Sequence, residues 1–207
     1  MSQDSTRTKE PMLADERRAA LGLAAIFALR MLGLFIVLPV FAVAARELTG
    51  GQDVAAVGLA LGAYGLTQAF LQLPFGILAD RWGRKPVIAC GLVLFVLGSV
   101  VCALADSVQT MTLGRMLQGS GAISAAITAL VADLTRDSQR SKAMAMVGGS
   151  IALMFALSLA MAPVLYGWVG LGGLFWFTCA LGIAAFWALF RLVSNGPADP
   201  HVEPRSI

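Results

Sequence analysis

Charged residues are scarce in this 207-residue chain: Lys, Arg, Asp and Glu together make up 13% of it, roughly half of their usual share in a soluble domain. Hydrophobic residues make up 58%. A soluble domain of this size could not cover so much apolar surface, which excludes a cytosolic enzyme and a nucleic-acid-binding module. We therefore expect no nucleic-acid partner, although the net charge is +3.

Histidine and cysteine are almost absent. The one histidine, His201, lies in the polar C-terminal stretch, and the three cysteines lie inside apolar runs. An intramembrane serine protease needs a buried Ser–His pair, and an aspartyl protease needs two Asp at membrane depth; neither pair is present. Clustered metal ligands and a phosphate-binding loop are missing as well. The sequence therefore predicts no enzymatic activity, no metal site and no cofactor.

Apolar runs of about 20 residues, the length that crosses a bilayer as a helix, recur along the whole chain. We expect an all-α integral membrane protein with a six-transmembrane-helix bundle over residues 21–193. A polar N-terminal tail, residues 1–20, precedes it, and residues 194–207 form a polar tail or the start of a central linker. The six expected spans are Leu21–Ala45, Val54–Leu78, Pro86–Ala105, Thr110–Leu134, Ala143–Trp168 and Leu174–Leu192.

The distribution of cations predicts the orientation of these spans. Short joints make successive helices antiparallel, and twelve of the fifteen Lys and Arg then fall on one side of the membrane. The opposite joints hold only Arg46, and Arg30 and Arg115 are left inside spans. The positive-inside rule places both termini in the cytoplasm and the protein in the plasma (inner) membrane.

Polar residues inside the spans are candidates for a functional site, because ionisable groups in the apolar slab are costly. Arg30 lies deep in the first span and Arg115 near the outer end of the fourth. Tyr64, Gln68 and Gln72 form a stripe along the second span. On one continuous fourth helix, Arg115 and Asp133 would share a face. These groups either hydrogen-bond neighbouring helices or line a path for substrate and protons.

The joint between the second and third spans, Gly76 to Pro86, combines glycines with a dense set of charges. Gly76 and Gly83 permit close approach and a tight reversal. Asp80 can pair with Arg84, while Arg81 and Lys85 remain at the cytoplasmic interface. A plain positive-inside turn is the alternative explanation of this joint.

This joint closely resembles the signature loop of the major facilitator superfamily, at the expected place in the topology. In that family the loop and an acid at the end of the fourth span, here Asp133, form a cytoplasmic latch. The resemblance thus implies a conformational latch made of Gly76, Asp80, Arg81, Gly83, Arg84, Lys85 and Asp133.

The fourth span adds a second resemblance, through the run from Arg115 to Ala122 with Gln118 inside it. It is similar to a motif of the drug:proton antiporter group, whose Arg is linked to proton transfer. Arg30-Met-Leu-Gly33 fits the same group, and residues 16–193 most resemble the first half of YajR-type transporters. The fifth span departs from the antiporter motif, with Ala162 and Ser158 where the group has glycines. No carboxylate lies in the middle of a span, so no coupling acid can be named.

The resemblance implies a secondary active transporter: proton-coupled efflux of a small amphipathic organic solute by alternating access, driven by the proton gradient. Its substrate and proton path would include Arg30, Tyr64, Gln68, Gln72, Arg115 and Gln118. Family members have two six-helix halves, so we expect a second half in the same chain or in trans. Arg115 and Gln68 would then face that half or lipid. The alternative is a non-transporting or partner-dependent six-span membrane protein.

Overall fold

The computed structural model describes residues 12–193. Residues 1–11 and 194–207, and with them His201, most of the expected N-terminal tail and the expected linker, lie outside the described residues. Between those limits the fold is helical, with one isolated β-bridge joining Thr49 and Ser107. The helices are α1 (Ala14–Phe35), α2 (Leu38–Ala44), a 3-10 turn (Ala45–Glu47), α3 (Val54–Trp82), α4 (Arg84–Ala103), α5 (Val108–Ser120), α6 (Ser124–Asp133) and α7 (Asp137–Leu192).

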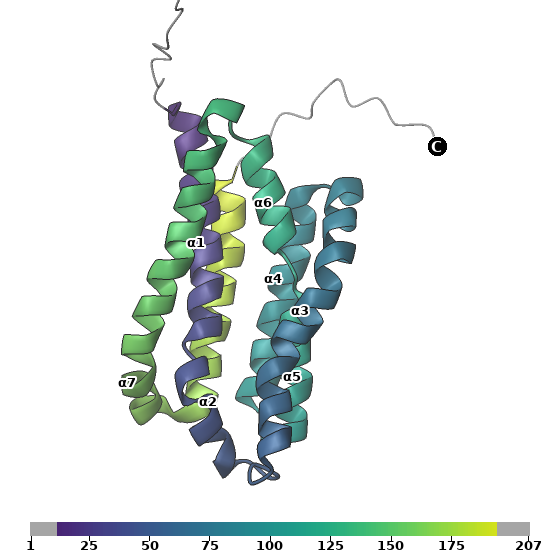
Figure 1. Cartoon of the computed structure of the whole chain (residues 1–207), viewed down its shortest axis with the longest axis vertical. Coiled ribbons are helices and arrows are strands. Elements are labelled where there is room, and N and C mark those ends of the chain that lie inside the picture. Colours follow the sequence, from purple (N-terminus) through teal and green to yellow (C-terminus); the bar gives the residue numbers. More distant parts are fainter. Residues whose placement is uncertain (1–11, 194–207) are drawn as a thin grey trace, which may run out of the picture.

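The expected six-helix membrane bundle is confirmed, although its last two spans form one hairpin. Five helical stretches within residues 12–193 are long and apolar enough to cross a membrane, and α7, at 56 residues, is the longest. At Gly170 the backbone leaves the helical region, with φ 67° and ψ −174°. A positive φ favours glycine, and here it reverses the chain, so that α7 descends and returns (Figure 1).

Two spans expected as continuous helices are broken. The first is interrupted between α1 and α2, because Pro39 has no N–H to donate to the carbonyl of Phe35. The fourth is interrupted at Gly121–Ile123, between α5 and α6. Arg115 and Asp133 therefore lie on separate helices, α5 and α6, and the expected continuous fourth helix with both on one face is wrong.

The signature joint is shorter than expected. Helix α3 continues to Trp82 and α4 begins at Arg84, so only Gly83 separates them. Gly83 has φ 94°, which L-residues with a side chain rarely adopt. Asp80 and Arg81 therefore lie on the last turn of a helix rather than in a loop.

Helix α1 packs against both arms of α7 (Figure 1). Ser150 on the first arm donates to the carbonyl of Ala24 at 3.3 Å, and Thr178 on the second arm donates to that of Gly33 at 2.9 Å. The start of α1, the α3–α4 and α6–α7 junctions and the end of α7 all lie at one end of the bundle. The described cation-rich segments are therefore gathered at that end, which we call the basic end.

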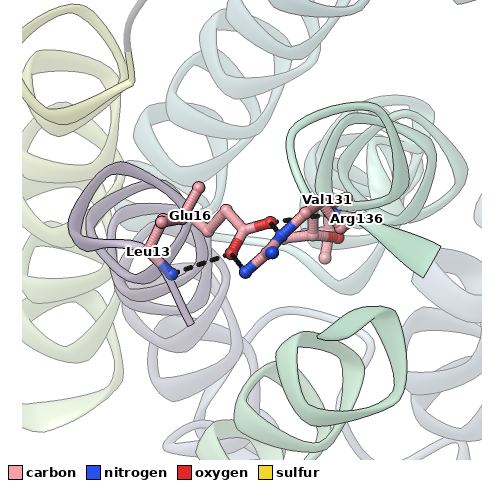
Figure 2. A network of polar contacts seen from close by, with 5 residues as sticks. Leu13, Glu16, Val131 and Arg136 are labelled. Carbon is pink, nitrogen blue, oxygen red and sulfur yellow. Dashed lines mark hydrogen bonds and ion pairs between the residues drawn. The ribbon is translucent and has the colours of Figure 1, made fainter. Parts of the chain in front are cut away.

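An ion pair at the basic end ties the start of α1 to the α6–α7 junction (Figure 2). Glu16 is buried, and its carboxylate accepts from the backbone N–H of Arg136 at 3.0 Å and from Arg136 Nε at 2.9 Å. It also accepts from the backbone N–H of Leu13 at 2.9 Å. One carboxylate thus satisfies donors from the start of α1 and from the α6–α7 junction, a pairing that sequence reasoning did not anticipate.

Replacing Glu16 by Gln is expected to destabilise the bundle by about 2 kcal/mol, because the charge-assisted bonds to Arg136 are weakened and a neutral amide offers the surrounding donors one acceptor oxygen fewer. Thermal unfolding in detergent should show a lower midpoint. The matched control is Asp15→Asn, which removes a neighbouring exposed carboxylate and should leave the midpoint unchanged. Equal midpoints for both variants would contradict a stabilising role for Glu16.

Candidate functional site

Two buried arginines form the polar centre of the bundle. Arg30 on α1 has no exposed surface, and Arg115 on α5 is 1% exposed. One nitrogen of Arg30, Nη2, donates to the carbonyl of Gly121 at 2.8 Å and to Gln68 on α3 at 3.3 Å. Since Gly121 lies where the fourth span breaks, Arg30 satisfies a carbonyl at the interruption of the helix.

Arg115 anchors a second chain of hydrogen bonds. Its Nη1 donates to Gln118 at 3.1 Å, and Gln118 in turn donates to the hydroxyl of Ser99 on α4 at 2.8 Å. Ser99 then donates to the carbonyl of Phe95 at 2.7 Å. Arg115 is thus held in one orientation by a network that crosses from α5 to α4.

The ring of Tyr64 lies within cation–π distance of both arginines. The guanidinium carbon of Arg115 is 5.0 Å from the ring centroid and that of Arg30 is 5.8 Å from it. The Tyr64 hydroxyl, Arg30 Nε and Nη1, and Arg115 Nε are buried and have no hydrogen-bond partner among the described residues. Both arginines and the tyrosine of the centre therefore have N–H or O–H groups that donate no hydrogen bond among the described residues.

The close approach of α5 to α3 depends on Gly119. A Cβ at this position would collide with the carbonyl oxygen of Tyr64. Without a side chain, the backbones of the two helices touch, and the ring of Tyr64 can lie over Arg115. The glycine next to Gln118 in the sequence thus has a steric role in building the centre.

Five of the six residues predicted for the path meet in this centre: Arg30, Tyr64, Gln68, Arg115 and Gln118. Gln72, one helical turn further along α3, is half-buried and makes no hydrogen bond to the two arginines. The expectation that Arg115 faces lipid or a second half is wrong, because Arg115 is 1% exposed and lies against the rings of Phe41 on α2 and Tyr64 on α3. Gln68 is half-buried.

Sequence reasoning missed three residues of the centre. Ser99 is fully buried and accepts from Gln118, and its hydroxyl inside an apolar run was the available indication. Phe95 and Phe41 lie 5.4 Å and 6.0 Å from the guanidinium carbons of Arg30 and Arg115. Nothing in the sequence distinguishes these two from the other phenylalanines of the spans.

A charge cluster at the basic end joins the ends of three helices. Arg84 on α4 pairs with Asp80 on α3, and its Nε lies 3.1 Å from a carboxylate oxygen of Asp133 on α6. These groups are open to solvent, with 63% of the Asp80 side chain and 53% of the Asp133 side chain exposed. Arg84 therefore bridges the signature joint to the end of the fourth span.

The other predicted latch residues surround this cluster in different ways. Lys85 donates to the carbonyl of Val193 at 2.7 Å and lies over the ring of Phe190, so it joins α4 to the end of α7. Arg81 is exposed. A Cβ at Gly76 would make only an ordinary contact with Ala125, so that glycine is not required for packing, whereas Gly83 is required by its positive φ.

The polar centre and the charge cluster at the basic end differ in their chemistry. Every carboxylate of the described segment lies at or beyond a helix end, so the central arginines have no acid beside them. Arginine stays protonated in proteins, so it can orient and attract a charged group but cannot carry a coupled proton. Within residues 12–193, no three His, Cys, Asp or Glu side chains gather as a group that could hold a metal ion.

Comparisons with known proteins agree with this architecture. The sequence model of the Major Facilitator Superfamily matches residues 23–206. The inner membrane transport protein YajR of Escherichia coli K12 is 48% identical over 184 residues, which cover 89% of this chain and 40% of that protein. The multidrug resistance protein MdtL of Shigella dysenteriae is 32% identical over 151 residues, covering 72% of this chain and 39% of MdtL.

A solved structure shows the same fold. The human organic anion transporter MFSD10 superposes with a TM-score of 0.72 at 21% identity, covering 88% of this chain and 48% of that one. The chain spans about 40% of the length of its curated relative YajR. With the family match extending over residues 23–206, the resemblance read from the signature joint is confirmed, and the chain belongs to the Major Facilitator Superfamily.

Proposed function

We propose that this chain is the N-terminal half of a secondary active transporter that exports a small amphipathic organic solute in exchange for protons. The observation that supports this most is the polar centre: two fully buried arginines share one tyrosine ring at membrane depth. Charges in such a place are costly and are typical of transport pathways. Two relatives support the solute class: MdtL, named for multidrug resistance, and the tetracycline resistance protein, class B, of Escherichia coli. The latter is 32% identical over 141 residues, which cover 67% of this chain and 34% of that protein.

The proposal includes the topology and the partner. The protein lies in the plasma (inner) membrane as a multi-pass protein with its basic end and both termini in the cytoplasm. A second six-helix half, in the same chain or in trans, completes the pathway, since transporters of this kind place their substrate site between two halves. No cofactor is required, because the proton gradient supplies the energy.

The charge cluster at the basic end is proposed to latch one of the alternating states. Arg84 bridges Asp80 and Asp133 across three helix ends, so a movement that separates α3 and α4 from α6 must break the bridge. Exposed ion pairs contribute only about 0–1 kcal/mol to stability. Such a bridge can therefore bias a conformational equilibrium without being needed for folding.

Replacing Asp80 by Asn or Arg84 by Ala is expected to reduce transport at least about fivefold, which corresponds to a small bias between two states. Insertion and the unfolding midpoint should change little. The matched control is Asp137→Asn, which breaks the exposed Asp137–Arg140 pair, 2.8 Å long, at the same end. If both variants transport at the wild-type rate, the charge cluster does not act as a latch.

Transport itself is tested with the complete gene product in everted membrane vesicles. The probes are tetracycline and a panel of amphipathic organic compounds, followed by their accumulation in energised vesicles. The proposal expects accumulation of at least one compound, and its loss when a protonophore collapses the pH gradient. Normal insertion without accumulation of any compound would favour a non-transporting or partner-dependent membrane protein instead.

A further inference from the structure

A hollow of about 810 Å³ opens on the outside of the bundle, between the start of α1 and the end of α7. Its lining includes two cations, Arg17 and Arg18, and an apolar part formed by Leu21, Gly22, Ala25 and Leu192. It lies at the basic end, away from the polar centre, and shares no residue with the charge cluster. The proposed transport function therefore gives this hollow no role.

The lining is amphipathic along the helix axis. Arg17, Leu21 and Ala25 follow one another at intervals of four residues, so they lie on one face of α1. The face changes from cationic to apolar over about 12 Å, the rise of eight helical residues. Gly22 packs against α7, where a Cβ would lie 3.1 Å from the Cβ of Leu192, so its missing side chain lets the two helices that line the hollow approach closely.

A second hollow of about 240 Å³ adjoins the first, since Arg18 and Leu192 line both. It adds the cation Arg191 and one carboxylate, Asp15. Within the described residues, none of the three arginines forms an ion pair. The two hollows therefore present three cations against one acid at the basic end.

We propose that these joined hollows bind an anionic phospholipid of the cytoplasmic leaflet. The phosphate would pair with Arg17 and Arg18, and an acyl chain would run over Leu21 and Ala25. Basic pockets between helix ends on the cytoplasmic side suit anionic headgroups. The apolar residues Leu21 and Ala25, which follow the arginines along α1, suit the acyl chain of the same lipid. Assignment to a leaflet rests on the proposed orientation, whereas the binding chemistry does not.

The test is native mass spectrometry of the complete gene product in detergent, titrated with dioleoylphosphatidylglycerol or dioleoylphosphatidylcholine. We expect the first phosphatidylglycerol to bind at least about tenfold more tightly than phosphatidylcholine, since each arginine near the phosphate favours the anion. The double variant Arg17→Gln/Arg18→Gln should lose most of this preference. The double variant Arg140→Gln/Lys142→Gln removes the same charge at the same end and should keep it.

A further variant tests the apolar part. Ala25 is exposed, so Ala25→Phe should fold normally, fill the hollow and weaken phosphatidylglycerol binding several-fold. Equal binding of the two lipids by the wild type, an unchanged preference in Arg17→Gln/Arg18→Gln, or unchanged binding by Ala25→Phe would each overturn the proposal. So would displacement of the lipid by equimolar inorganic phosphate, which would indicate a free-anion site.

This result is separable from the transport assay. If the wild-type protein transports normally but binds the two lipids equally, the lipid site alone is overturned. If it prefers phosphatidylglycerol but transports no compound, the transport function alone is overturned.

Discussion

Replacing Arg115 by alanine is expected to abolish proton-linked flux while the protein still inserts and folds. Arg115 is the buried cation whose orientation is fixed through Gln118 and Ser99, and its charge lies beside the ring of Tyr64. Alanine removes the charge and leaves Gln118 without its donor. The measurement is accumulation of a transported compound in everted vesicles, with and without the pH gradient.

Two further variants decide what Arg115 contributes. Arg115→Lys keeps the charge but loses the planar fork that reaches Gln118, so a large loss of flux is expected there too. Arg46→Ala removes one cation from the exposed turn at the opposite end and should transport normally. Proton-linked flux that persists in Arg115→Ala would show that the antiporter motif has no coupling role in this chain.

Replacing Gly119 by alanine is expected to have the largest effect on stability, about 3 kcal/mol. The added Cβ would collide with the Tyr64 carbonyl oxygen, and backbone atoms cannot rotate away as a flexible side chain can. The helices α3 and α5 must separate, which costs packing across their whole interface. We expect aggregation or a strongly lowered unfolding midpoint in detergent, measured by fluorescence-detected size-exclusion chromatography after heating.

Gly62→Ala is the matched control, because it makes the same substitution on α3 where nothing lies within 4 Å of the added Cβ. Alanine is a better helix former than glycine, so this variant should be as stable as the wild type or slightly more stable. If Gly119→Ala unfolds at the same temperature as Gly62→Ala, the close backbone contact between α3 and α5 does not exist.

The spans were predictable because a helix that crosses a bilayer needs about 20 apolar residues, and such runs are visible directly in the sequence. The reversal at Gly170 lies in the expected joint between the fifth and sixth spans, but the interruptions inside the first and fourth spans were not predicted. Pro39 is visible in the sequence, but another proline, Pro74, lies inside an uninterrupted helix. At the break, the carbonyl of Gly121 accepts from Arg30, 91 residues away, and local sequence gives no indication of such a tertiary contact.

The candidate site was partly predictable for a similar reason. Arg30 and Arg115 stand out because charges in an apolar run are rare, and they do lie in one centre. Their burial inside the six-helix bundle could not be foreseen, since it depends on glycine contacts between helices. The Glu16–Arg136 pair joins residues 120 positions apart, and a charge outside the apolar runs gives no indication of its partner.

Proton-coupled exchange is tested most directly by measuring the proton movement that substrate causes in proteoliposomes. These contain only the purified complete gene product. A pH-sensitive dye is enclosed, a pH gradient is imposed, and a compound accumulated by the vesicles is added. We expect proton flux that depends on the compound and is absent in Arg115→Ala. Transport of the compound without any proton movement would contradict proton-coupled exchange.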